Sequence, residues 1–158
     1  MSATVGGHIA SLTTKTWDQG PAPITTDEVF AGKTVVVFGV PGAFTPTCSM
    51  KHLPGFIEHS QALKDAGADA IVCHSVNDPW VLNAWAKDAG AAEDMVMLAD
   101  WDASFAKALG VDADMSGGGL GVRAKRYALI AKDKEITYFE VGDLDVSGAE
   151  TVLAALKG

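Results

Sequence analysis

Cysteine is scarce in this sequence, because its 158 residues contain only two, Cys48 and Cys73. A small secreted domain held together by disulfides would contain more. We therefore expect a reducing, cytoplasmic environment, in which a cysteine is catalytic, binds a metal or is simply buried. Spacings of the CxxC or HxxxH kind are also missing, so we predict no metal site.

Long apolar runs and excess positive charge are missing as well. No apolar run approaches the length of a membrane span, and 12 basic residues face 20 acidic ones, for a formal net charge of −8. This balance argues against a nucleic acid or an anionic membrane as the main partner. The first eight residues show no basic segment followed by an apolar one, so we expect no secretion signal. With 48% hydrophobic residues and no repeat or linker, we predict a single domain over residues 1–158.

The apolar pattern predicts alternating strands and helices. The predicted strands are 34–40, 70–76 and 95–99, followed by a hairpin of 126–130 and 135–139. The predicted helices cover 48–66 with a kink at Pro54, Asn77-Asp78-Pro79 to Gly90, a segment from a cap at Asp102 to near Gly110, and 147–156. The first thirty residues give weaker signals, with β-formers at 9–17 and turn residues at 20–23.

This order of elements determines the expected sheet. Right-handed crossovers make the early strands parallel, and the late hairpin adds an antiparallel pair. We therefore predict an α/β fold with a mixed central sheet flanked by helices. It matches the thioredoxin-like architecture better than a fully parallel, doubly wound sheet.

Cys48 follows the apolar strand 34–40 at the predicted start of a helix. Unpaired backbone N–H groups and the helix dipole favour an anion there, and a thiolate is the anion that this position offers. Thr45 is near enough in a turn to bond to the sulfur or to a substrate, and Pro41 and Pro46 stiffen the loop. The alternative is that Cys48 is a small buried hydrophobe, as most cysteines outside disulfides are.

The residues around Cys48 resemble a known signature. The spacing Pro41-x-x-x-Thr45-x-x-Cys48 is similar to the active-site motif of the peroxiredoxins. The longer run 38–49, with His52-Leu53-Pro54-Gly55-Phe56 after it, resembles the type II, or peroxiredoxin-5-like, subfamily. Segments 75–78, 98–100 and 126–129 also fall where that subfamily has similar ones. The resemblance covers nearly the whole chain, and it implies a thioredoxin-like fold and a thiol-dependent peroxidase for hydrogen peroxide and alkyl hydroperoxides.

The same resemblance implies the roles of individual residues. Cys48 would be the peroxidatic cysteine, and Pro41, Thr45 and Arg126 would complete the catalytic site. His52, one helical turn beyond Cys48, would line or brace the pocket, to which Phe44 and Arg123 would also contribute. No cofactor is expected.

Elementary thiol chemistry shows why Cys48 alone would not suffice. A thiol with a pKa near 8.5 is about 3% ionised at pH 7, so a lowered pKa gains only about thirtyfold in thiolate. A low-pKa thiolate is also intrinsically less nucleophilic. The remaining acceleration must come from stabilising the charge that builds on the leaving oxygen, which a fixed guanidinium and a hydroxyl would supply. Arg126 is the expected guanidinium.

Cys73 lies in the predicted strand 70–76, so burial is its default. Either Cys73 resolves the sulfenic acid formed on Cys48 by forming a disulfide with it, or Cys73 takes no part and an external thiol completes the cycle. A disulfide between the two would require the first helical turn to unwind. Glutathione with glutaredoxin, or thioredoxin, is the expected external reductant. The resemblance also makes a homodimer plausible.

Two rival functions remain open. One is a thiol–disulfide oxidoreductase on the same fold, although Thr45 stands where a CxxC motif would need its other cysteine. The other is a non-enzymatic redox sensor or binding module that uses Cys48 as a switch. A dinucleotide-binding loop at the glycine run 117–121 is rejected, because this run neither follows a predicted strand nor opens a helix.

Overall fold

A computed structural model describes residues 3–47, 51–91 and 95–158 of the chain. Within these residues, seven strands form one sheet in the order β2-β1-β5-β4-β3-β8-β9. Their bounds are β1 Thr13–Trp17, β2 Pro21–Thr25, β3 Thr34–Val40, β4 Ala70–Ser75, β5 Met95–Ala99, β8 Tyr127–Lys132 and β9 Glu135–Val141. A second, two-stranded sheet pairs β6 (Asp112–Asp114) with β7 (Val122–Ala124).

The sheet is mixed, as predicted. Strands β3, β4 and β5 run parallel, while β8 and β9 join as an antiparallel hairpin on one side. The three parallel strands come from the apolar runs of the sequence, because strands covered on both faces need side chains that are apolar on both faces. At the other edge lies the hairpin β1–β2, which the sequence signalled only weakly.

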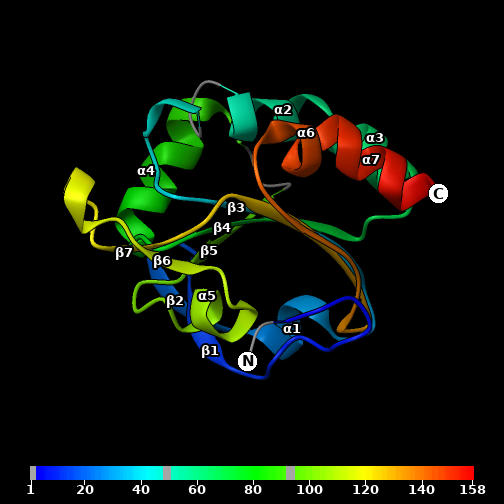
Figure 1. Ribbon diagram of the computed structural model, residues 1–158, viewed down its shortest axis with the longest axis horizontal. Coiled ribbons are helices and arrows are strands. Elements are labelled where there is room, and N and C mark those ends of the chain that lie inside the picture. Colours follow the sequence, from blue (N-terminus) through cyan, green and yellow to red (C-terminus); the bar gives the residue numbers. More distant parts are fainter. Residues whose placement is uncertain (1–2, 48–50, 92–94) are drawn as a thin grey trace.

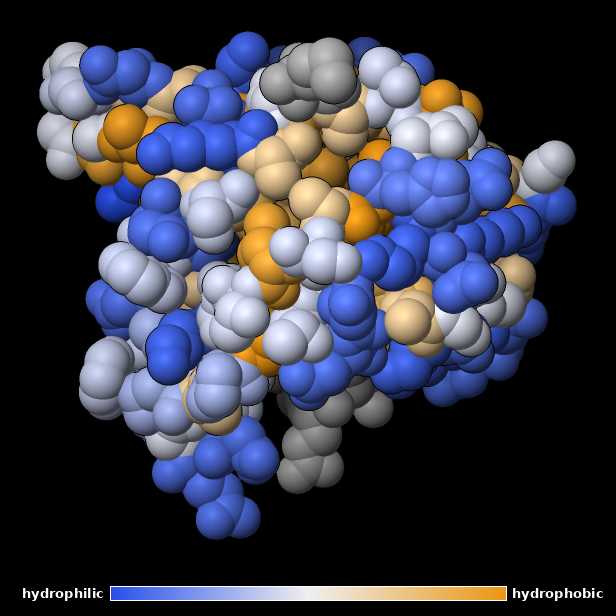
Figure 2. Space-filling view, turned by 90° about the horizontal axis from the view of Figure 1, so that it is seen from below, coloured by the Kyte–Doolittle hydropathy of each residue, from blue (hydrophilic) through white to orange (hydrophobic). Residues whose placement is uncertain are grey.

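Helices cover both faces of the sheet (Figure 1). On one face lie α2 (Leu53–Glu58), α3 (Ser60–Asp65), α4 (Pro79–Ala89), α6 (Leu144–Ser147) and α7 (Ala149–Lys157). On the other lie α1 (Thr26–Phe30) and α5 (Ser104–Leu109). Each face has its own apolar core, with Phe38, Phe56 and Trp85 in the first and Phe30, Phe105 and Tyr127 in the second. Seen from the side of α1 and α5, the surface is mostly hydrophilic with a narrow strip of hydrophobic residues (Figure 2).

Two helix predictions need correction. The predicted helix 48–66 is two helices, α2 and α3, because the backbone of His59 leaves helical geometry with φ −96° and ψ 7°. Pro54 stands in the first turn of α2, where a proline is well tolerated, and the kink expected there stays a prediction. The start of the prediction, residues 48–50, lies outside the described residues.

The cap of α5 also differs from the expectation. Asp102 accepts one hydrogen bond, from the N–H of Ser104 at 3.1 Å. The next two N–H groups, of Phe105 and Ala106, donate to Asp100 instead, at 2.9 and 2.8 Å. The cap of α4 agrees with the prediction, because the Asp78 carboxylate accepts from Val81 N and Pro79 stands in the first turn. The prediction of one domain over residues 1–158 stays a prediction.

Candidate active site

The carboxyl ends of β3 and β4 hold the loop that leads to Cys48. Asn77 follows β4, and its Oδ1 accepts from the backbone N–H of Ala43 at 3.0 Å and from the Ser75 hydroxyl at 2.5 Å. Parallel strands end at the same edge of a sheet, so a side chain after one strand can fix the loop after its neighbour. Residues 41–45 are therefore tied to β4 as well as to β3.

Thr45 is oriented by its own turn. Its hydroxyl donates to the carbonyl of Gly42 at 2.7 Å, and the side chain is half-buried. Because the hydroxyl hydrogen is used in this bond, the oxygen faces other groups as an acceptor. Pro46 and Thr47 then take helical geometry. Cys48 itself lies outside the described residues.

Phe44 stands out in the same loop. Its φ of +64° is unusual for a residue with a bulky side chain. The ring is 52% exposed, and its centroid lies 6.5 Å from that of the buried Trp85. The side chain of Phe44 is therefore exposed on the loop, and its pocket role stays a prediction.

Arg126 and His52 come together although 74 positions separate them. The guanidinium Nη1 of Arg126 donates to Nδ1 of His52 at 2.8 Å, and Nε2 of His52 donates to the backbone carbonyl of Ser147, also at 2.8 Å. His52 is only 1% exposed. The imidazole therefore links Arg126 to the last residue of α6 and holds the guanidinium in position.

The pKa of His52 is lowered to about 4, because burial, with a smaller contribution from the charge of Arg126, outweighs the opposing hydrogen bond to Ser147. The ring is consequently neutral at pH 7. A neutral imidazole has one N–H, which Ser147 takes at Nε2, so Nδ1 is an acceptor for Arg126. This tautomer suits a support for a cation.

Arg123 lies against the loop backbone. Its Nε donates to the carbonyl of Leu120 at 2.9 Å and its Nη1 to the carbonyl of Pro41 at 3.2 Å. The contact is close, because a Cβ on Gly42 would come within 2.6 Å of Nη1. Arg123 thus ties the β6–β7 hairpin to the start of the loop.

Cys73 is fully buried in β4, as the sequence predicts. It stands between Phe38 of β3 and Met97 of β5 in the register of the sheet. Its side chain belongs to the core on the face of α2, α3, α4 and α7. Any separation from Cys48 lies outside the described residues.

Sequence reasoning missed the partners rather than the reactive groups. The contact of Ser147 uses a main-chain carbonyl, which leaves no mark in a sequence. Asn77 was expected only beside a helix cap, although the run Ser75-Val76-Asn77-Asp78 was recognised as part of the resemblance. The buried cluster of His74, Asp100 and Tyr127 was not predicted at all.

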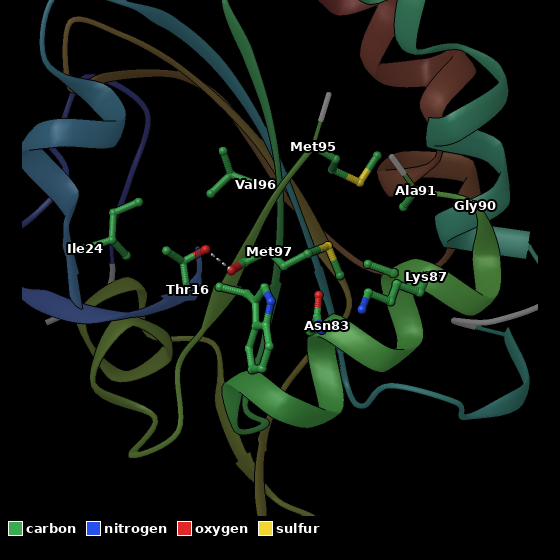
Figure 3. Close-up of a pocket in the computed structure, with 11 residues that line it drawn as sticks. Thr16, Ile24, Asn83, Lys87, Gly90, Ala91, Met95, Val96 and Met97 are labelled. Carbon is green, nitrogen blue, oxygen red and sulfur yellow. Dashed lines mark hydrogen bonds between the residues drawn. The ribbon is translucent and has the colours of Figure 1, made fainter. Parts of the chain in front are cut away.

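A sizeable cavity lies elsewhere on the molecule. It measures about 620 Å³ and opens between α4, β1, β2 and β5, with Met95, Met97 and Lys87 around it (Figure 3). Of the residues expected in the catalytic site, the described ones, Pro41, Thr45 and Arg126, do not line it. Among the described residues, no three His, Cys, Asp or Glu side chains are grouped so that they could hold a metal ion. No described helix is long and apolar enough to cross a membrane.

Comparison with known proteins identifies the family. The Redoxin family model matches residues 4–153. Peroxiredoxin-2B of Arabidopsis thaliana is 48% identical over 129 residues, which are 80% of each chain. Peroxiredoxin-2C of the same plant is 40% identical over 158 residues, covering 97% of this chain and 98% of the relative. The chain belongs to the redoxin family and is a peroxiredoxin.

Solved structures agree with this assignment. Reduced Prx3 from Vibrio vulnificus in complex with H2O2 is 44% identical, with a TM-score of 0.91 over 98% of this peroxiredoxin and 99% of that chain. Peroxiredoxin 5 from Alvinella pompejana is 29% identical, with a TM-score of 0.86 and 98% of each chain covered. The resemblance to type II peroxiredoxins and the thioredoxin-like fold are thereby confirmed. The protein is an oxidoreductase of the thiol peroxidase class.

Proposed function

We propose that this peroxiredoxin reduces hydrogen peroxide and alkyl hydroperoxides through Cys48, with Thr45, Arg126 and Pro41 as the other catalytic residues. The observation that carries the proposal is the Arg126 guanidinium, held at 2.8 Å by a neutral His52 only four residues beyond Cys48. A cation braced at that place suits a reaction in which negative charge develops. The relative Prx3 of Vibrio vulnificus was solved with H2O2, which supports a peroxide as the substrate.

The proposed reaction begins with the Cys48 thiolate. Its sulfur attacks the terminal oxygen of the hydroperoxide, an S–O bond forms and the O–O bond breaks. The leaving oxygen carries away the electron pair, takes up a proton and departs as water or an alcohol. Cys48 is left as sulfenic acid.

Thr45 and Arg126 act on different parts of the peroxide. The Thr45 hydroxyl already donates to Gly42, so its lone pairs are suited to accept the hydrogen of the terminal peroxide oxygen. The fixed charge of Arg126 is suited to the leaving oxygen, where charge grows most in the transition state. Pro41 stiffens the loop, and its carbonyl is held by Arg123. Together these groups supply the part of the rate acceleration that a lowered thiol pKa does not.

Stopped-flow tryptophan fluorescence with hydrogen peroxide tests this proposal. The parent should react with a rate constant orders of magnitude above that of a thiol in solution. Cys48→Ser should abolish the reaction, whereas Cys73→Ser should retain it. A parent no faster than cysteine itself would favour a redox sensor, and a Cys48→Ser variant with the parent rate would exclude Cys48 as the nucleophile.

For the return half of the cycle, we propose an external thiol, either glutathione with glutaredoxin or thioredoxin. The sulfenic acid and two thiols give the Cys48 thiol, one disulfide and water. The position of Cys73 supports this choice over an internal disulfide. It lies in a central strand that is paired on both sides, and a disulfide needs Cα atoms within about 7 Å of each other.

Mass spectrometry after one equivalent of peroxide separates the two schemes. The external scheme predicts sulfenic acid, or a mixed disulfide when glutathione is present, at Cys48 alone. An intramolecular disulfide in the parent would instead make Cys73 the resolving residue. Supplying the glutaredoxin and thioredoxin systems in parallel then identifies the reductant by its rate of peroxide turnover.

We also propose a homodimer formed through the edge that carries the site. Exposed apolar side chains lie after each of the parallel strands there, with Phe44 52%, Trp80 62% and Trp101 58% exposed. Such a group of exposed aromatic residues is typical of an interface. Sedimentation should show a dimer at micromolar concentration that Trp80→Glu dissociates, and a monomeric parent would contradict it.

We also propose a cytoplasmic location for the protein, which the scarcity of cysteine supports.

A further inference from the structure

Three polar side chains form a buried hydrogen-bonded chain on the face of α5. Nε2 of His74 lies 2.8 Å from Oδ2 of Asp100, and Nδ1 of His74 lies 2.8 Å from the hydroxyl of Tyr127. All three residues are fully buried. The reaction proposed above uses none of them. Burying three polar side chains costs free energy unless each forms hydrogen bonds, so a buried group of this kind needs a structural or functional explanation.

The two ends of this hydrogen-bonded chain, Asp100 and Tyr127, have shifted pKa values. Burial raises the pKa of Asp100, but the hydrogen bond and charge of His74 and the N–H groups of Phe105 and Ala106 outweigh it, so the net pKa is lowered. Burial, together with the charges of Asp100 and Cys73, raises the pKa of Tyr127 well above its ordinary value. The phenol of Tyr127 therefore keeps its hydrogen, and the Asp100 carboxylate accepts from Nε2–H of His74.

The ring of Tyr127 sits where the two halves of the site meet. Tyr127 and Gly39 are direct partners in the antiparallel pair β8–β3. The ring occupies the space above Gly39 so closely that a Cβ there would lie 1.9 Å from its Cε1. Gly39 precedes Pro41 by two residues, and Arg126 immediately precedes Tyr127. The carboxyl end of β3 leads to the Cys48 loop, and Arg126, with its guanidinium, stands directly before β8.

The hydrogen bonds from Tyr127 to His74 and from His74 to Asp100 connect this ring to two other strands of the sheet. His74 belongs to β4, whose carboxyl end also holds the loop through Asn77. Asp100 follows β5, and its backbone N–H donates to the carbonyl of Ser75 at 3.0 Å. The position of Tyr127 is consequently set by β4 and β5 as well as by β3 and β8.

We propose that the Asp100–His74–Tyr127 chain holds the Cys48 loop and Arg126 at a fixed separation, which makes Tyr127 a positioning residue for peroxide reduction. The inference rests on the proposed function of Cys48 and Arg126. Tyr127 touches neither peroxide nor sulfur in this scheme. It acts through Gly39 on one side and through the backbone of Arg126 on the other.

The test is a double-mutant cycle of Tyr127→Phe and His74→Gln. Tyr127→Phe keeps the ring over Gly39 and removes only the hydroxyl, and His74→Gln keeps a donor for Asp100 while losing the ring nitrogen that Tyr127 contacts. We expect each to lower the rate constant for hydrogen peroxide about tenfold and to raise the apparent pKa of the Cys48 thiol. Because both remove the same contact, the double variant should lose little more than either single one.

A matched control separates positioning from stability. Thr26→Val removes another buried hydrogen bond, from the Thr26 hydroxyl to the carbonyl of Ala10 at 2.7 Å, at the start of α1. It should lower the melting temperature as Tyr127→Phe does and leave the rate and the thiol pKa unchanged. A Tyr127→Phe variant with the rate and thiol pKa of the parent would overturn the inference, whatever its melting temperature. If His74→Gln does not fold, the rate and thiol pKa of Tyr127→Phe alone decide the test. The parent and Cys48→Ser, measured alongside, show separately whether the proposed function holds.

Discussion

Arg126 donates to a histidine that has no positive charge of its own, because burial keeps His52 neutral while Ser147 takes its only N–H. A cation supported by a neutral acceptor keeps its full charge, whereas a carboxylate in the same place would neutralise it. The arrangement therefore orients the guanidinium without weakening the field that it exerts on the site. This pairing ties the guanidinium proposed to act with Cys48 to α6, which is far away in the sequence.

Replacing His52 by phenylalanine should slow peroxide reduction. The ring of His52 packs beside Phe38 and Phe56, with centroids 5.0 and 5.5 Å away, so a phenyl ring keeps the packing and removes both hydrogen bonds. We expect the second-order rate constant to fall about tenfold, which corresponds to about 1.4 kcal/mol. Stopped-flow kinetics with hydrogen peroxide measures it. His59→Phe, seven residues further along at the junction of α2 and α3, is the matched control and should keep the parent rate.

The same residue should make the fold sensitive to acid. The pKa of His52 is lowered to about 4 in the folded protein, from 6.5 in the unfolded chain. Between these values the unfolded chain binds the extra proton, so stability decreases as the pH falls from 6.5 towards 4. The loss should reach about 2 to 3 kcal/mol by pH 4.5.

Denaturant unfolding of the parent and of His52→Phe at pH 7 and pH 4.5 measures this effect. The variant lacks the titrating ring, so its stability should change less between the two pH values. Equal changes in the two proteins would assign the acid sensitivity to other groups. Asp100 is not such a group, because its pKa lies below 3.8 and its contribution is lost only at lower pH.

Gly42→Ala should act on the site through Arg123. The new methyl group would come within 2.6 Å of the Arg123 Nη1 and 3.2 Å of the Thr45 Cγ2. A long side chain can move away, so we expect the fold to persist and the contact of Arg123 with the Pro41 carbonyl to be lost. The rate constant should fall to that of Arg123→Met, and the double variant should be no slower. Gly55→Ala is the control, since no atom of the described residues lies within 4 Å of its added Cβ.

The sequence predicts the centre of the fold better than its edges. The runs at 34–40, 70–75 and 95–99 are recognisable because a strand covered on both faces is apolar throughout. The edge strand β2 contains Pro21 and Pro23, which look like turn residues in a sequence and are tolerated at a sheet edge. Helix α1 escaped notice although Thr25 and Glu28 form a capping box, which is a signal that the sequence does contain.

The site divides in a similar way. Cys48, Thr45 and Arg126 were expected because residue types and a specific motif mark them. The links between them depend on tertiary contacts, such as those of Arg126 with His52 and of Asn77 with Ala43. Contacts across 74 and 34 positions follow from the fold and not from local sequence, so no spacing rule could supply them.

The central claim is that Arg126 accelerates the reaction beyond ionising the thiol. The decisive measurement is the rate constant for hydrogen peroxide per Cys48 thiolate in the parent and in Arg126→Gln, with the thiolate fraction taken from the pH dependence of each protein. If the guanidinium stabilises the leaving oxygen, the rate per thiolate should fall by about 10² to 10³. A loss of rate that the smaller thiolate fraction explains completely would contradict the claim.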